Sequence, residues 1–300
     1  GPNPLAQGYT MKDSILAALE PTDESVHVFN VANRVAQKHD QSLNLINVVR
    51  PVVAHYPDVS FAHLADSAYA WQREVVRGNK EFFAQVPDLD TSQLDVVEGN
   101  PVHEIVQAIE KTNATMAVMG VRNRSGLQKL LGSTALGVLN STDCDLLAVH
   151  PDSDANDYKR IVVVVDTSST AGAVLSKAAK FASGAQHLEI ITVIVPLAHL
   201  YPTPYTATAT AFSFTEFGDF AEKSTREIVT EAATQAGLPT EAVAIRTGDP
   251  KDEIVAAAEE GKADLIVVGS DSKGVISRML LGSTARGVLD RTPCDVLVCR

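Results

Sequence analysis

The chain has 300 residues, of which 45% are hydrophobic and 21% are charged, a composition typical of a globular protein and not of a disordered, collagen-like or disulfide-dense chain. No apolar run approaches the roughly 18 residues that a membrane span needs. The 25 basic and 37 acidic residues give a net charge of −12, which would repel nucleic acids and anionic membranes. A small anion needs only a local group of donors.

The first half predicts alternating strands and helices. Strands are expected at residues 15–19, 43–49, 94–97, 116–119 and 145–149, with a helix after the first strand and a long helix after the second. Residues 1–10 are uncharged and lack the pattern of a signal peptide, so we interpret them as an added leader.

The second half predicts the same order. Strands are expected at residues 161–165, 188–195, 242–246, 265–268 and 295–299. Helices are expected after Ser168, through the region of Ile228 and Val229, over residues 252–260 and from Ser283. Residues 201–214 are read as a surface loop leading into a helix or, alternatively, as a lid over a ligand. Alternating strands and helices predict parallel sheets with helices on both faces.

The two halves are copies of one another. Residues 132–149 and 282–299 are identical at 11 of 18 positions, and so long a period indicates a duplicated domain. We expect domains at 11–150 and 157–300, joined by a polar linker. The last strand of each half, 145–149 and 295–299, is a short apolar edge, so pairing of these two strands in a pseudo-dimer is expected to protect both. Further association into a homodimer is possible.

Three cysteines, Cys144, Cys294 and Cys299, form no Cys-x-x-Cys pair, which favours a reducing, cytoplasmic compartment. Burial explains the equivalent Cys144 and Cys294 better than reactivity does.

A loop suited to phosphate follows the fourth strand of the second half. Gly269 directly follows a buried strand, where a glycine lets a ligand approach the backbone closely. Gly282, Ser283 and Thr284 open the next helix, whose free N–H groups and hydroxyls suit an anion. Lys273 adds positive charge to an acidic protein. The alternative is a tight turn followed by an ordinary helix cap.

The loop is similar to the pattern Gly-x2-Gly-x9-Gly-Ser/Thr and is followed by a last strand of the form Cys-Asp-hydrophobic. In this the chain resembles the universal stress protein family, and the resemblance runs from Met11 to Arg300 in the manner of its tandem members. It implies two tandem five-stranded parallel-sheet domains of the adenine nucleotide α-hydrolase-like α/β class. It also implies that ATP or AMP binds, with an acidic residue after the first strand and a valine in the second holding the adenosine, and the glycine loop holding the phosphates.

Carried over residue by residue, the resemblance fits the second half better. The nucleotide contacts it implies there are Asp166, Val193, Gly269, Ser272, Lys273, Gly282, Ser283 and Thr284. Ser272 replaces the middle glycine of the motif. In the first half the weaker equivalents are Glu20, Val48, Gly120, Gly132 and Ser133. There Asn123 replaces the middle glycine, and the loop is one residue shorter.

The resemblance therefore predicts a cytoplasmic stress-response regulator that binds ATP or AMP, with or without Mg²⁺, chiefly in the second domain. We expect no catalytic residues and no metal-binding residues, and at most slow ATP hydrolysis. The expected partners are a small nucleotide and unidentified proteins, with no nucleic acid and no membrane. The alternative is a scaffold or interaction protein that keeps the fold without binding nucleotide, which the altered middle glycines favour.

Overall fold

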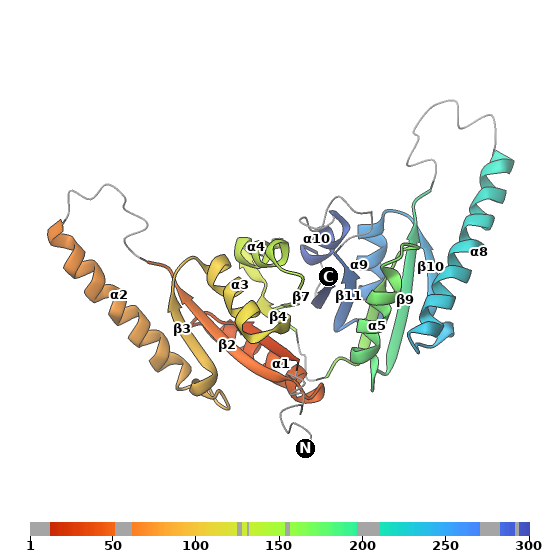
Figure 1. Cartoon of the computed structure of the whole chain (residues 1–300). Helices are drawn as coiled ribbons and strands as arrows, with labels where there is room; N and C mark the ends of the chain where they lie inside the picture. The colour runs from red at the N-terminus through yellow and green to blue at the C-terminus, as the bar shows by residue number, and fades with distance from the viewer. Residues whose placement is uncertain are drawn as a thin grey trace, which may run out of the picture. The chain divides into compact units, whose positions relative to one another are not determined.

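The computed structural model describes residues 13–51, 62–124, 128–130, 132–153, 157–196, 211–270, 283–291 and 294–300. The chain divides into two compact units, Gly1–Ala117 and Val118–Arg300 (Figure 1). This division falls within a strand of the first repeat and not at the linker after residue 150, because the last strand of the first repeat pairs with the last strand of the second.

The first unit has the order β4-β1-β2-β3, with parallel pairing of β1 with β2 and of β2 with β3. Its elements are β1 (Ser14–Ala18), α1 (Asp23–Lys38), β2 (Ser42–Val49), α2 (Ala62–Phe83), the 3-10 turn η2 (Thr91–Gln93), β3 (Leu94–Glu98), α3 (Pro101–Thr112) and the start of β4 (Ala114–Gly120).

The second unit has the order β10-β9-β8-β11-β12-β7, followed by the end of β4. Its elements are β5 (Arg122–Arg124), β6 (Gln128–Leu130), α4 (Ser133–Ser141), β7 (Asp145–Val149), β8 (Arg160–Val164), α5 (Ala171–Ala182), β9 (His187–Ile194), α8 (Ala211–Gln235), η3 (Thr240–Ala242), β10 (Val243–Thr247), α9 (Pro250–Gly261), β11 (Leu265–Gly269), α10 (Ser283–Leu289) and β12 (Asp295–Cys299).

The second repeat forms the five-stranded parallel sheet that its sequence predicts. Each neighbouring pair from β10 to β12 is parallel. The run of β-branched residues in β8 is buried, as expected of a strand that helices cover on both faces. Right-handed crossovers place α5 and α8 on one face and α9 and α10 on the other, and the helices of each pair contact one another (Figure 1).

Pairing of the two last strands is confirmed. β7 and β12 are antiparallel, with Leu147 opposite Leu297. Two repeat-related aspartates extend the pairing: the carboxyl of Asp145 accepts the Arg300 N–H at 2.8 Å, and that of Asp295 accepts the His150 N–H at 2.8 Å. The same bond is therefore made twice, as expected for two halves related by an internal two-fold.

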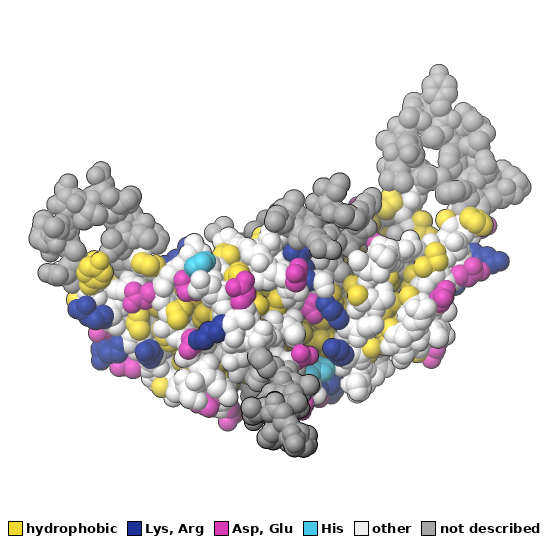
Figure 2. All heavy atoms as spheres, in the orientation of Figure 1, with side chains coloured by type: hydrophobic (Ala, Val, Ile, Leu, Met, Phe, Trp, Pro, Cys, Tyr) yellow, Lys and Arg dark blue, Asp and Glu magenta, His cyan; other side chains and the backbone are white. Residues whose placement is uncertain are grey.

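The surface is mixed in charge. On the face drawn in Figure 2, acidic and basic side chains are interspersed. Large apolar side chains are exposed on α2, at Tyr69 and Trp71, and on α8, at Phe220 and Ile228. Over the described residues, no helix has both the length and the apolar character that crossing a membrane requires. Of the segment at 201–214, residues 211–214 form the start of α8, and the rest lies outside the described residues.

Candidate functional site

The order of the second-repeat sheet fixes where a ligand would sit. The order in which the chain adds strands to the sheet reverses between β8 and β11, and in open α/β sheets ligands bind at the carboxyl ends of the strands beside such a point. Val164 of β8 pairs with Ile191 of β9 and with Val268 of β11. Extending this register brings Asp166 level with Val193, and Gly269 level with the residue before Asp166.

Asp166 is half-buried and is held by the turn that leads into α5. Its Oδ1 accepts the N–H of Ser168 at 2.9 Å and also the hydroxyl of that serine. The Ser168 hydroxyl lies 2.8 Å from that of Thr170, the N-cap residue of α5. This chain of contacts fixes the carboxyl at the strand end where an acidic residue was expected.

The first repeat ties the end of its first strand in the same way as the second repeat does, but its acidic side chain is more exposed. Thr192 of β9 donates its hydroxyl to the Val165 carbonyl at 2.9 Å, and Asn47 of β2 donates its amide to the Leu19 carbonyl at 2.8 Å. These carbonyls precede Asp166 and Glu20, so the two strand ends are tied to their neighbours in the same way. Glu20, however, is exposed, whereas Asp166 is half-buried.

The structure describes more of the glycine loop in the first repeat than in the second. In the second repeat, Gly269 ends β11, whereas Ser272, Lys273 and Gly282 lie outside the described residues. Ser283 and Thr284 begin α10, as expected.

In the first repeat, Gly120 ends β4, Gly132 is the N-cap of α4 and Ser133 is the first residue of that helix. Val48 is half-buried in β2. Asn123, at the position of the middle glycine, lies in β5 and pairs with Lys129 of β6. The sequence did not predict this short hairpin. It gives the first loop a strand pairing of its own in place of an open glycine turn.

A pocket of about 410 Å³ opens beside Gly269, between the first turns of α5 and the ends of β11 and β12. Of the predicted site residues that the structure describes, Gly269 lines it. Sequence reasoning missed the others, which come together only through the fold. The lining residues are Asp143, Thr170, Ala173, Val174, Gly269, Ser270, Cys299 and Arg300.

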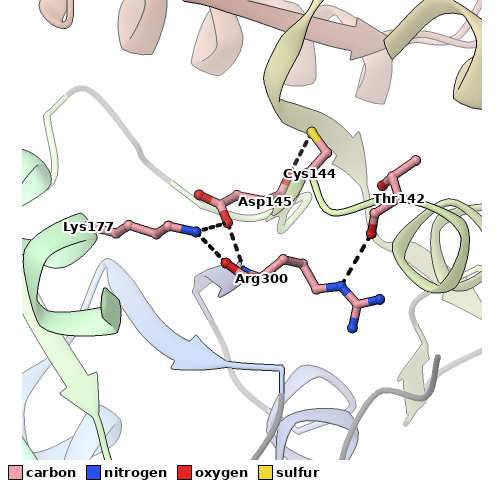
Figure 3. A network of polar contacts seen from close by, with 5 residues as sticks. All are labelled: Thr142, Cys144, Asp145, Lys177 and Arg300. Carbon is pink, nitrogen blue, oxygen red and sulfur yellow. Dashed lines mark hydrogen bonds and ion pairs between the residues drawn. The ribbon is translucent and has the colours of Figure 1, made fainter. Parts of the chain in front are cut away.

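Arg300 is anchored at this pocket by a polar network, drawn in Figure 3. Its N–H donates to Asp145 Oδ1, and its Nε donates to the Thr142 carbonyl at 3.3 Å. Lys177 Nζ of α5 lies 2.6 Å from Asp145 Oδ1 and 2.6 Å from the Arg300 main-chain oxygen. The loop before β7, the end of β12 and α5 are thereby tied together.

The cysteines are unsuited to nucleophilic chemistry. All three are buried and form no disulfide, which confirms the burial expected for Cys144 and Cys294. Burial raises the pKa of the Cys299 thiol to about 12 and raises that of Cys294 as well. Across the described part of the chain, no group of three or more metal-ligating side chains comes together.

Comparison with known proteins decides the family. The model of the universal stress protein family matches the chain twice, at residues 11–150 and 157–300. The chain belongs to the universal stress protein family.

The chain is also similar to individual universal stress proteins. A universal stress protein of Mycolicibacterium smegmatis is 23% identical over 95% of this chain and 96% of its own length. In fold, the crystal structure of a universal stress protein from Archaeoglobus fulgidus covers 96% of this chain and 98% of its own, with 22% identity and a TM-score of 0.62. A universal stress protein solved in complex with cAMP is 26% identical and covers 48% of this chain and 98% of its own, with a TM-score of 0.35.

Proposed function

We propose that this universal stress protein is a cytoplasmic stress-response regulator that binds ATP or AMP at the carboxyl edge of its second repeat. One observation carries the proposal: on three adjacent strands at the switch point, the extended strand register brings Asp166 level with Val193 and Gly269 level with the residue before Asp166. A carboxylate there can accept hydrogen bonds from ribose hydroxyls, an apolar side chain can cover a base, and a glycine lets phosphate approach the backbone.

The loop residues Ser272, Lys273, Gly282, Ser283 and Thr284 complete the proposed phosphate contacts, with Mg²⁺ neutralising phosphate charge when it is present. A cytoplasmic location accords with three buried cysteines that form no disulfide. Self-association of the chain into a homodimer stays a prediction.

The test is equilibrium dialysis with ATP and AMP, with and without Mg²⁺, on the parent chain and matched variants of the two repeats. Asp166→Ala is expected to weaken binding by roughly 10- to 100-fold, because a hydrogen bond to a charged group contributes about 1.5–3 kcal/mol. Glu20→Ala, its counterpart, is expected to change binding little. Gly282→Val and Gly132→Val form a second matched pair with the same expected asymmetry.

Ser272→Gly tests the departure from the family motif. If the middle position needs positive φ, glycine will tighten binding, since it adopts that conformation without strain. If it does not, the change will be neutral or slightly harmful. Equal losses from the paired variants of the two repeats would contradict the assignment to the second repeat.

The second candidate is a scaffold that binds no nucleotide. The hairpin around Asn123 favours it for the first repeat, because strand pairing occupies backbone groups that a phosphate loop would offer. A parent chain that retains no nucleotide in dialysis, and whose melting temperature does not move at millimolar ATP or AMP, would establish this second candidate.

A further inference from the structure

Helix α2 carries an apolar stripe beside the face that packs on the sheet. On the packed face, Gln72 and Phe83 are buried, and the Asn79 amide donates to Asn47 Oδ1 of β2 at 2.8 Å. A neighbouring face repeats apolar or small residues at alternating intervals of three and four, which place side chains in one line along a helix. We call this line the α2 stripe. It consists of Ala68, Trp71, Val75, Gly78 and Phe82.

The α2 stripe is accessible in the described structure. Trp71 is 59% exposed, and Gly78 is exposed as well. Ala68, Val75 and Phe82 are half-buried. The element that α2 chiefly contacts is β3, the last strand of its sheet (Figure 1), so no further strand of the described sheet lies on the outer side of the helix. A large aromatic side chain in such a place is the kind of residue that anchors a protein interface.

The packing of the described chain gives no reason for Gly78. This residue lies inside a 22-residue helix, where glycine is unfavourable compared with alanine. Among the described atoms, nothing lies within 4 Å of the point where a Cβ on Gly78 would stand. Crowding within the chain therefore does not require a glycine here. A partner that placed a large side chain against this point would require one.

The α2 stripe is complementary to a second copy of itself. Two α2 helices that run antiparallel about a two-fold axis at Val75 place Ala68 of one copy opposite Phe82 of the other, because both lie seven residues from Val75. Trp71 and Gly78 lie four and three residues from Val75, so they face each other to within one residue, or about 1.5 Å along the helix. Each large side chain of the stripe thus meets a small residue of the other copy.

The charges beside the α2 stripe permit this contact in an acidic protein. Glu74 and Glu81 flank the stripe, and Arg77 between them forms an ion pair with Glu74 and another with Glu81 at 3.3 Å. Residues 73–81 include three basic and two acidic residues, a net of +1, whereas the whole chain carries −12. This part of α2 therefore does not add to the repulsion between two copies of the chain.

The corresponding helix of the second repeat does not carry the stripe. α8 packs against α5. At the offset of 150 between the repeats, the buried Phe83 corresponds to the buried Ala233. At the same offset Ala221 replaces Trp71, and Ile228 replaces Gly78. Both the large residue and the space that would receive it are therefore features of the first repeat.

We propose that the α2 stripe is a homodimer interface and that the α2 stripe of a second copy of the chain occupies it. The two helices pack antiparallel about a two-fold axis near Val75, and Trp71 of each copy fills the space beside Gly78 of the other. Because the same face is used by both copies, the assembly closes at two. One helix face is a small interface, so a weak dimer is expected. The proposal does not depend on nucleotide binding in the second repeat.

The test is analytical ultracentrifugation of the full chain over about 1 μM to 1 mM, the range in which a weak dimer dissociates. Trp71→Ala should weaken dimerisation by about 30-fold or more, because the two-fold removes the anchor from both copies. Tyr69→Ala removes an aromatic ring of similar exposure, 54%, from another face of the same helix and should leave dimerisation unchanged. Ile228→Ala, at an exposed apolar residue of α8, should also leave it unchanged.

Gly78→Ala separates a binding role from a folding role. In a dilute sample it should raise the melting temperature, because alanine favours the helix and the described chain leaves room for its methyl group. It should also weaken dimerisation about fivefold or more, because the methyl group meets Trp71 of the other copy. A lower melting temperature would show that the chain keeps Gly78 for its own folding, and it would overturn the proposal.

Val75→Cys tests the antiparallel arrangement. On the two-fold axis this residue meets its own copy, so oxidised glutathione should convert the variant into a disulfide-linked dimer. The native cysteines are buried and should not compete. Tyr69→Cys should stay uncrosslinked under the same conditions.

Four results would each overturn the proposal. They are a parent chain that stays monomeric over the whole range, dimerisation that Trp71→Ala leaves unchanged, a Val75→Cys variant that does not crosslink, and a loss in Ile228→Ala equal to that in Trp71→Ala. The last result would indicate that α2 docks on α8 of another copy.

Discussion

Asp295 is expected to be among the most costly polar side chains to remove in the second unit. Its side chain is fully buried at the start of β12. One carboxyl oxygen accepts the His150 N–H at 2.8 Å, and the other accepts the Tyr158 hydroxyl at 2.7 Å. Asp295→Ala removes both bonds and leaves two buried donors without this acceptor. At about 1–3 kcal/mol per donor, the expected loss is about 3–4 kcal/mol of unfolding free energy.

Its repeat counterpart provides the matched comparison. Asp145 accepts the Arg300 N–H and the Lys177 ammonium, but 12% of its side chain and 29% of that of Lys177 are exposed. Water can reach both groups after Asp145→Ala, so a smaller loss of about 1–2 kcal/mol is expected. Asp95→Ala, at an exposed ion pair with Lys111, is expected to cost less than about 1 kcal/mol.

Urea unfolding, followed by circular dichroism, measures the loss of unfolding free energy in all three variants. The slope of unfolding free energy against urea concentration is checked to be the same in each. Tyr158→Phe divides the Asp295 contribution, because it removes one bond and keeps the His150 contact. The expected order of loss is Asp295, then Asp145, then Asp95. A loss for Asp295→Ala within error of that for Asp95→Ala would refute the reasoning that the paired strand ends depend on these carboxyl acceptors.

Two further predictions concern helix caps and thiols. Asn100 caps α3 by accepting the Val102 N–H at 3.0 Å, and Asp249 caps α9 by accepting the Lys251 N–H at 2.9 Å. Asn100→Ala and Asp249→Ala should therefore each lower the unfolding free energy measured in urea by about 1 kcal/mol. No loss in either variant would contradict the cap assignment. With a pKa near 12 in place of 9.0, Cys299 should have about a thousandfold less thiolate at pH 8 and resist iodoacetamide until urea unfolds the chain. Since the neutral thiol is favoured in the folded state, its contribution to stability should be complete below pH 9 and decline above it. Rapid native labelling of Cys299, read by mass spectrometry, would show the burial argument to be wrong.

The sequence predicts the fold well because its signals are local and occur twice. Strand 295–299 is predicted at its observed bounds, because the Cys-Asp pair marks its start and the apolar run that follows marks its length. Some strands shift by one residue, as β8 does, where residues 161–165 were expected and Arg160–Val164 is found. The hairpin of β5 and β6 was missed, because strands of only three residues, with a single apolar residue, Leu130, between them, lack the alternation that identifies a strand.

Some residues of the candidate site could be predicted from the sequence and others could not. Gly269 and Asp166 could be found because each lies at or just beyond the end of a buried strand. Asp143 and Arg300, by contrast, lie 157 positions apart in sequence (300 − 143) and reach one pocket only because β7 pairs with β12. No local pattern carries that information. Ser270 was overlooked because a serine after a glycine is common in turns, and its burial is visible only once the surrounding backbone is placed.

The pairing of β7 with β12 sets an order of events during synthesis. β7 begins at residue 145 and β12 at residue 295, 150 residues later. Among the described strands, none between them in the sequence pairs with the edge of β7 that β12 covers. At about 5–20 residues per second, a nascent chain presents the apolar edge of β7 for roughly 8 to 30 seconds before β12 leaves the ribosome. During that interval the edge can be captured by another nascent chain. A fused duplicate therefore gains a partner in its own chain but must wait for it until the second repeat has been made.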